Sequence, residues 1–101
     1  MRFQVVIAEE AEREFAGAVD YYDQRETGLG QKFARAVRDV FKTACENPER
    51  FRRYSRLARK VKVPDWPYSV YFTIKTDMRE VVVISVWHGA RNPAELRRRL
   101  K

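Results

Sequence analysis

Two side chains that could do chemistry, His88 and Arg91, stand where the last predicted strand ends, a place where rigid elements often position functional groups. His88 is the only histidine, and an imidazole exchanges protons near neutral pH, so it could act as a general acid or base. A ring hydrogen-bonded to the backbone and a contact with a partner are the two alternatives. The single cysteine, Cys45, lies on a distant predicted helix. We therefore expect no zinc site and no cofactor.

Two lysines, Lys60 and Lys62, alternate along a short predicted strand and therefore project from the same face of the sheet. Alternation also predicts Tyr71 and Trp87 on that face, and cations beside aromatic rings are typical of a binding surface. In the alternative interpretation the lysines are a solvated strand face that discourages edge pairing, and the two rings belong to the core.

Positive charge is concentrated in the second half of the chain. The formal net charge is +7, with 7 Lys/Arg and 10 Asp/Glu in residues 1–49 but 14 Lys/Arg and 4 Asp/Glu in residues 50–101. Residues 50–62 carry seven basic side chains and no acidic one. Such a field favours nucleic acid, ribosomes or an acidic protein, although charge runs are also common on solvated surfaces. The residues that we expect to contact a partner or target are Arg52, Arg53, Arg56, Arg59, Lys60, Lys62, Tyr71, Trp87, His88 and Arg91.

Hydrophobic spacing predicts the elements that position these residues. Residues 2–7 alternate as a short strand, and two amphipathic helices follow, separated at Thr27–Gly30 and ended by Asn47–Pro48. Further strands are predicted over residues 59–63, 68–75 and 81–88, the last of them central because it is apolar on both faces. Residues 93–101 form either a short helix with proline at its start or a disordered basic tail. The helix faces predicted to be buried comprise Ala11, Phe15, Ala18, Val19 and Tyr22, and Phe33, Val37, Val40, Phe41 and Ala44.

The order of elements predicts one α+β domain over residues 1–101. We expect two layers: an N-terminal strand and an antiparallel helical hairpin packed on one face of a mainly antiparallel sheet, in the order strand, helix, helix, strand, strand, strand. The other face is expected to be only partly covered. No apolar run of about 18 residues occurs, so we expect no membrane span. A single cysteine and an N-terminus too short for a signal peptide indicate a cytoplasmic protein.

These landmarks, taken in order, resemble a RelE/ParE-superfamily toxin of a type II toxin–antitoxin (plasmid-stabilisation) module. The resemblance covers nearly the whole chain and implies a bacterial growth inhibitor that a cognate acidic antitoxin neutralises in a hetero-oligomer. ParE-like members of the superfamily poison DNA gyrase, and RelE-like members cut mRNA on the ribosome. The segments that carry the resemblance are Tyr21-Tyr22, Gly28-Leu29-Gly30, Asn47-Pro48, Pro67-Tyr68-Ser69-Val70-Tyr71 and His88-Gly89-Ala90-Arg91-Asn92-Pro93.

The RelE-like pattern is incomplete in this chain. RelE-like nucleases also place two lysines where this chain has Lys60 and Lys62, which implies that the pair could hold a phosphate. Where they typically have an arginine, however, this chain has Ser69, and no tyrosine follows Tyr71 to serve as their C-terminal base. The departures favour a ParE-like binding protein over an enzyme, with a ribosome-dependent endoribonuclease and a non-toxic degenerate member as alternatives. For a nuclease, the catalytic candidates are Lys60, Lys62, His88 and Arg91.

Overall fold

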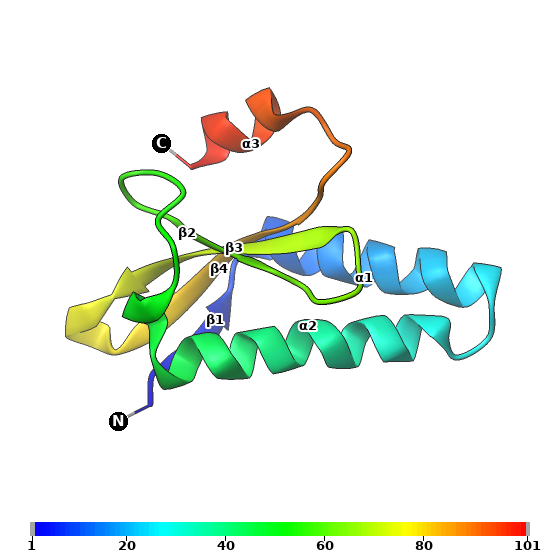
Figure 1. Ribbon diagram of the computed structural model, residues 1–101, viewed down its shortest axis with the longest axis horizontal. Coiled ribbons are helices and arrows are strands. Elements are labelled where there is room, and N and C mark those ends of the chain that lie inside the picture. Colours follow the sequence, from blue (N-terminus) through cyan, green and yellow to red (C-terminus); the bar gives the residue numbers. More distant parts are fainter. Residues whose placement is uncertain (1, 101) are drawn as a thin grey trace.

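A four-stranded sheet organises the chain, with two long helices on one face and a short helix on the other (Figure 1). The computed structural model describes residues 2–100. The elements in chain order are β1 (Gln4–Ile7), α1 (Glu9–Arg25), α2 (Leu29–Glu46), the 3-10 turn η1 (Pro48–Arg50), β2 (Arg59–Lys62), β3 (Tyr68–Lys75), the 3-10 turn η2 (Thr76–Met78), β4 (Glu80–His88) and α3 (Pro93–Arg99).

The strands lie in the spatial order β1-β4-β3-β2. The last three form an antiparallel meander, in which Tyr68 lies opposite His88 and Lys62 opposite Ser69. β1 instead joins the far edge of β4 in parallel, with Gln4 opposite Glu80. The prediction that β4 is a central strand is therefore confirmed. β1 begins two residues later than the sequence pattern predicts.

The helical hairpin forms one layer, as predicted. Gly28 adopts a φ of 89° at the turn, a left-handed conformation that favours glycine. The turn is shorter than predicted, because α2 already includes Gly30, whose N–H donates to the Asp23 carboxylate at 2.7 Å. A Cβ on Gly30 would lie 2.3 Å from the Val19 carbonyl oxygen, so the two helices approach closely at this point.

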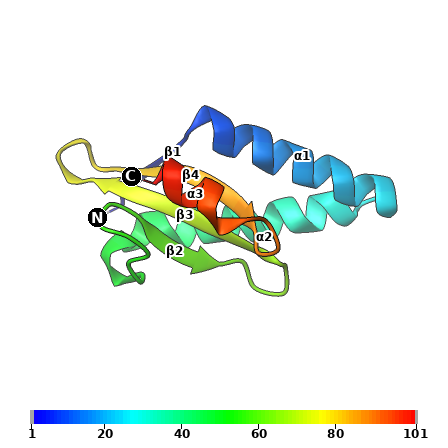
Figure 2. The same cartoon turned by 90° about the horizontal axis from the view of Figure 1, so that it is seen from above.

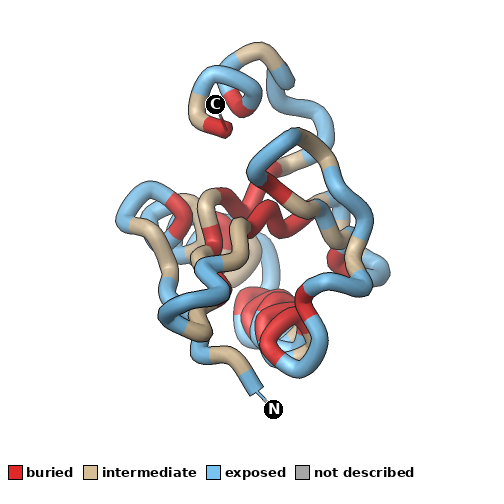
Figure 3. The backbone as a smooth tube through the Cα atoms, turned by 90° about the vertical axis from the view of Figure 1, so that its left-hand side faces the viewer, coloured by how far each residue is buried: buried red, intermediate tan, exposed pale blue. Residues whose placement is uncertain are grey.

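The main core lies between this hairpin and the sheet. The apolar stripe predicted for the second helix is buried along its whole length, and Figure 3 shows buried positions concentrated on α2 and on the strands that face it. On α1 only Ala11 and Ala18 are fully buried, while Phe15, Val19 and Tyr22 pack at the margin of the core. Within residues 2–100, no helix is long and apolar enough to cross a membrane.

A second, smaller core lies on the opposite face of the sheet, beneath α3. Figure 2 shows α3 lying across β3 and β4. Residues 93–99 are therefore a helix and not a disordered tail, and the Asn92 side chain accepts a hydrogen bond from the Ala94 N–H as its N-terminal cap. The face is partly covered, as expected: Leu96 and Leu100, four residues apart, pack over β3 and β4, whereas Lys60 and Lys62 on β2 stay exposed.

Candidate functional site

The residues expected to contact a partner do not gather at one place. Tyr71 and Trp87 lie beneath α3, with 4% and 3% of their surface exposed, so neither can serve as an exposed contact while α3 is in place. This burial also raises the pKa of Tyr71, with a smaller contribution from the neighbouring Tyr54. Tyr71 therefore stays protonated at neutral pH and cannot act there as a general base.

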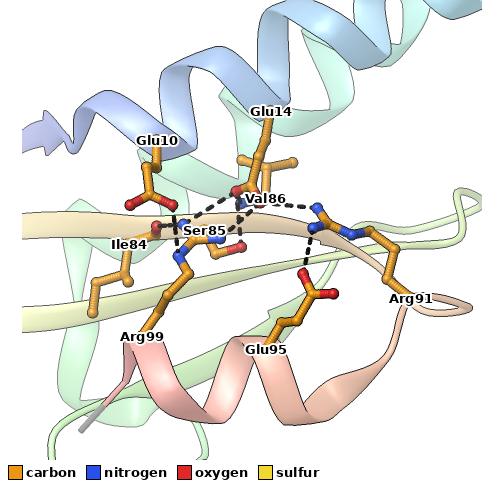
Figure 4. Close-up of polar contacts among 8 residues, drawn as sticks. All are labelled: Glu10, Glu14, Ile84, Ser85, Val86, Arg91, Glu95 and Arg99. Carbon is orange, nitrogen blue, oxygen red and sulfur yellow. Dashed lines mark hydrogen bonds and ion pairs between the residues drawn. The ribbon is translucent and has the colours of Figure 1, made fainter.

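A carboxylate that the sequence analysis missed, Glu14 on α1, occupies the centre of the polar network around α3 (Figure 4). Its Oε2 atom accepts hydrogen bonds from Arg91 Nη1 at 3.1 Å and from Arg99 Nη1 at 2.8 Å. Its Oε1 atom accepts from Ser85 Oγ at 3.0 Å and from the Val86 N–H at 3.2 Å. One side chain thus ties α1, β4 and both ends of the C-terminal segment together.

The two arginines of this network have further partners. Arg99 donates to the Ile84 carbonyl oxygen at 2.7 Å and pairs with Glu10 at 3.2 Å. The Arg91 guanidinium carbon lies 3.8 Å from the centroid of the Trp87 ring, and its Nη2 pairs with Glu95 at 3.3 Å. Arg91 is thus engaged within the protein and does not stand free as a phosphate clamp.

The sequence does carry a signal for Glu14. It follows Ala11 by three residues and precedes Ala18 by four, so it lies within the apolar stripe of α1 where a charge needs a partner. Its side chain is 15% exposed. An acidic residue in such a stripe predicts a buried ion pair, although it does not identify the arginines that complete it.

His88 adopts the backbone-bonded arrangement at the end of β4. Its Nδ1 atom accepts a hydrogen bond from the Ala90 N–H at 2.9 Å, and its ring packs edge-on against Tyr68, with 5.0 Å between centroids. Nδ1 therefore acts as an acceptor for the backbone in this arrangement. The ring thus helps to shape the turn after β4.

The two lysines of β2 have different surroundings. The Lys60 ammonium lies 5.8 Å from the ring centroids of both Tyr54 and Tyr71 and is exposed. The Lys62 ammonium donates to the carbonyl oxygens of Val63 and Trp66 and so braces the turn between β2 and β3. Only Lys60 of the pair therefore presents its charge over an aromatic surface.

The basic loop, residues 51–58, connects η1 to β2 and is held by hydrogen bonds from two arginines. Arg59 Nη1 donates to the carbonyl oxygens of Glu49 at 3.1 Å and Phe51 at 2.7 Å, which anchors the base of the loop. Arg53 Nη1 donates to the Arg56 carbonyl oxygen at 2.9 Å across the loop. Two of the predicted contact residues thus have structural roles in addition to their charge.

An apolar groove separates the basic loop from α3. It has a volume of about 800 Å³. Leu57, one of its lining residues, exposes 58% of its surface, although large apolar side chains usually pack inward. The lining residues are Tyr54, Ser55, Arg56 and Leu57 from the loop and Arg97 and Leu100 from the C-terminal segment.

The geometry favours binding over catalysis. Of the four catalytic candidates, Arg91 and Lys62 are engaged in contacts within the protein, and the His88 ring bonds to the backbone. Across residues 2–100, no three His, Cys, Asp or Glu side chains lie close enough together to hold a metal ion. An exposed cationic loop beside an apolar groove is instead suited to an acidic protein partner.

Comparison with known proteins gives a family match over most of the chain. Residues 5–93 match the family described as the ParE toxin of type II toxin–antitoxin system, parDE. No curated protein sequence matches the chain.

Solved structures of toxins share its fold. A chain from the chromosomal ParDE TA system from P. aeruginosa has a TM-score of 0.74 at 13% sequence identity, over 86% of this chain and 96% of that one. A mutant E. coli toxin RelE in the free state has a TM-score of 0.73 at 17% identity, over 99% and 95%. The isolated E. coli RelE toxin has a TM-score of 0.66 at 17% identity, over 95% and 94%. The chain is thus similar in fold to toxins of both kinds.

Proposed function

Because the chain belongs to the ParE toxin family of type II toxin–antitoxin systems, we propose that it arrests bacterial growth by binding DNA gyrase in the cytoplasm, and that a cognate acidic antitoxin neutralises it. The family match over residues 5–93 carries this proposal. A toxin of this kind acts as a binding protein, so it needs complementary surfaces and no catalytic constellation.

The surroundings of the nuclease candidates support a binding role. At the position where a RelE-like nuclease typically has its arginine, Ser69 is 8% exposed and lies on β3 opposite Trp87. Arg91, one of the catalytic candidates for a nuclease, is held by Glu14 and Glu95. A phosphate that entered here would compete with these two carboxylates for the Arg91 guanidinium.

Controlled expression in a bacterial host without the antitoxin tests the target. We expect growth arrest together with an SOS response, and we expect the purified protein to inhibit supercoiling by purified gyrase. Co-expression of a small acidic protein encoded beside the gene, which we expect to be the antitoxin, should restore growth. Growth arrest with normal gyrase activity would refute the gyrase target, and harmless expression would indicate a degenerate member of the family.

A ribosome-dependent endoribonuclease is the second candidate, and the position of Lys60 favours it. Its ammonium is exposed, so its charge is accessible to an RNA phosphate. Primer extension on translated mRNA would detect cleavage. Loss of cleavage in both Lys60→Ala and His88→Ala would assign those residues to it, whereas cleavage that persists in both variants would remove their assigned roles.

A further inference from the structure

We propose that the groove between the basic loop and α3 binds an acidic amphipathic segment of the antitoxin while α3 remains in place on the sheet. The segment would insert an apolar side chain beside Leu57 and place its carboxylates against Arg56 and Arg97. This inference rests on the proposed function, because it assigns the occupant to the antitoxin.

The floor of the groove is suited to an apolar anchor. Leu57 is 58% exposed and faces the groove together with Leu100 of the C-terminal segment. Covering such a side chain with a partner removes apolar surface from water and favours association. The single aromatic ring of the lining, Tyr54, packs edge-on against Tyr71 with 4.9 Å between centroids. The aliphatic floor therefore fits a protein side chain better than a stacked nucleobase.

The rim of the groove fixes the charge of the partner. Arg56 stands on the loop side and Arg97 on the helix side, and both residues are exposed. The basic loop adds Arg52 and Arg53, and Arg98 follows on α3. With cations on both sides of an apolar floor, the complementary ligand has apolar residues along one face and carboxylates on both flanks.

Both walls of the groove are ordered before any partner binds. The loop is closed by hydrogen bonds from the Tyr54 and Ser55 N–H groups to the Ala58 carbonyl oxygen, at 2.9 and 3.1 Å. The opposite wall belongs to α3, which the Arg99–Glu14 ion pair holds against α1 and β4. A preformed groove spares the partner the cost of ordering it, which favours tight binding.

Calorimetric titration of the full-length toxin with the acidic protein encoded beside its gene tests the inference. Leu57→Glu removes the apolar contact for the inserted side chain and places a negative charge in the groove, where it repels the carboxylates of the partner. This variant should weaken binding by at least about tenfold. Met78→Glu on η2 is the matched control, because Met78 is also 58% exposed but lies outside the groove lining. This control variant should bind within about twofold of the wild type.

A second pair of variants tests the rim. Arg97→Glu should weaken binding more than Arg98→Glu, its neighbour on the same helix, because only Arg97 lines the groove. Equal affinities of Leu57→Glu and Met78→Glu would overturn the groove assignment and leave the proposed function intact. A wild-type protein that does not bind the neighbouring gene product would overturn both. Self-association that Leu57→Glu abolishes would assign the groove to a second copy and also overturn the inference.

Discussion

Replacing Glu14 by glutamine should detach α3 from the sheet, because it removes the carboxylate to which Arg91 and Arg99 both bind. The substitution keeps the size of the side chain and one oxygen that can accept the hydrogen bonds from Ser85 and Val86, so the loss of charge is the main change. A hydrogen bond to a charged group contributes about 1.5–3 kcal/mol, and solvent screening reduces this where the partners are partly exposed.

The exposures of the two partners set the expected magnitude. The Glu14 side chain is 15% exposed and that of Arg99 is 20% exposed, so their ion pair is mostly shielded from water, whereas Arg91 is 46% exposed. We expect the free energy of unfolding to fall by about 2–3 kcal/mol. For a domain of this size, that loss corresponds to a melting temperature lower by about 10–20 °C.

Two measurements separate detachment of α3 from a general loss of stability. Urea and thermal unfolding give the stability change. Tryptophan emission in a Trp66→Phe background reports on Trp87 alone, which is 3% exposed beneath α3 and should shift to longer wavelength when the helix leaves.

Glu10→Gln is the matched control for this experiment. Glu10 also pairs with Arg99, at 3.2 Å, but its side chain is 59% exposed, so its loss should cost no more than about 1 kcal/mol. Equal destabilisation by Glu10→Gln and Glu14→Gln, with unchanged Trp87 emission in both, would refute the conclusion that the Glu14 charge holds α3.

Two further predictions concern packing and pH. Gly30→Ala should destabilise the protein by at least about 2 kcal/mol, because the added Cβ would collide with the Val19 carbonyl oxygen. Gly17→Ala should instead stabilise it by up to about 1 kcal/mol, because a Cβ at Gly17 would have no other atom within 4 Å. Urea unfolding measures both changes, and similar effects would contradict the close helix approach. Burial raises the pKa of three tyrosines above the usual value, so their contribution to stability is complete below about pH 10 and is lost as the pH rises further. The three residues are Tyr22, Tyr68 and Tyr71. Equilibrium unfolding between about pH 8 and 11 measures this loss of stability, and a free energy of unfolding that stays constant over the range would contradict the prediction.

Local pattern was sufficient to predict the helices, the strands and a mainly antiparallel sheet, because spacing records which face of an element is buried, but it did not predict the parallel pairing of β1 with β4. Local pattern did not predict the polar network around Glu14. Glu14 accepts from Arg91 and Arg99, which lie 77 and 85 residues away in the chain. Nothing in the spacing of α3 shows which surface the helix returns to, since that depends on the Asn92 cap and on these distant ion pairs. For the same reason Tyr71 and Trp87 could be placed on a face, but their burial beneath α3 could not be predicted.

The parallel pairing of β1 with β4 has a consequence for how the protein is made. Gln4 is synthesised 76 residues before its pairing partner in the sheet, Glu80 (80 − 4 = 76). Contacts that span so much of the chain form late and slow the folding rate. Before β4 and α3 have been synthesised, a nascent chain contains the helical hairpin but cannot form the complete sheet. It also lacks the ion pair between Arg99 and Glu14. A premature stop codon before Glu80 should therefore yield a fragment that cannot complete the sheet.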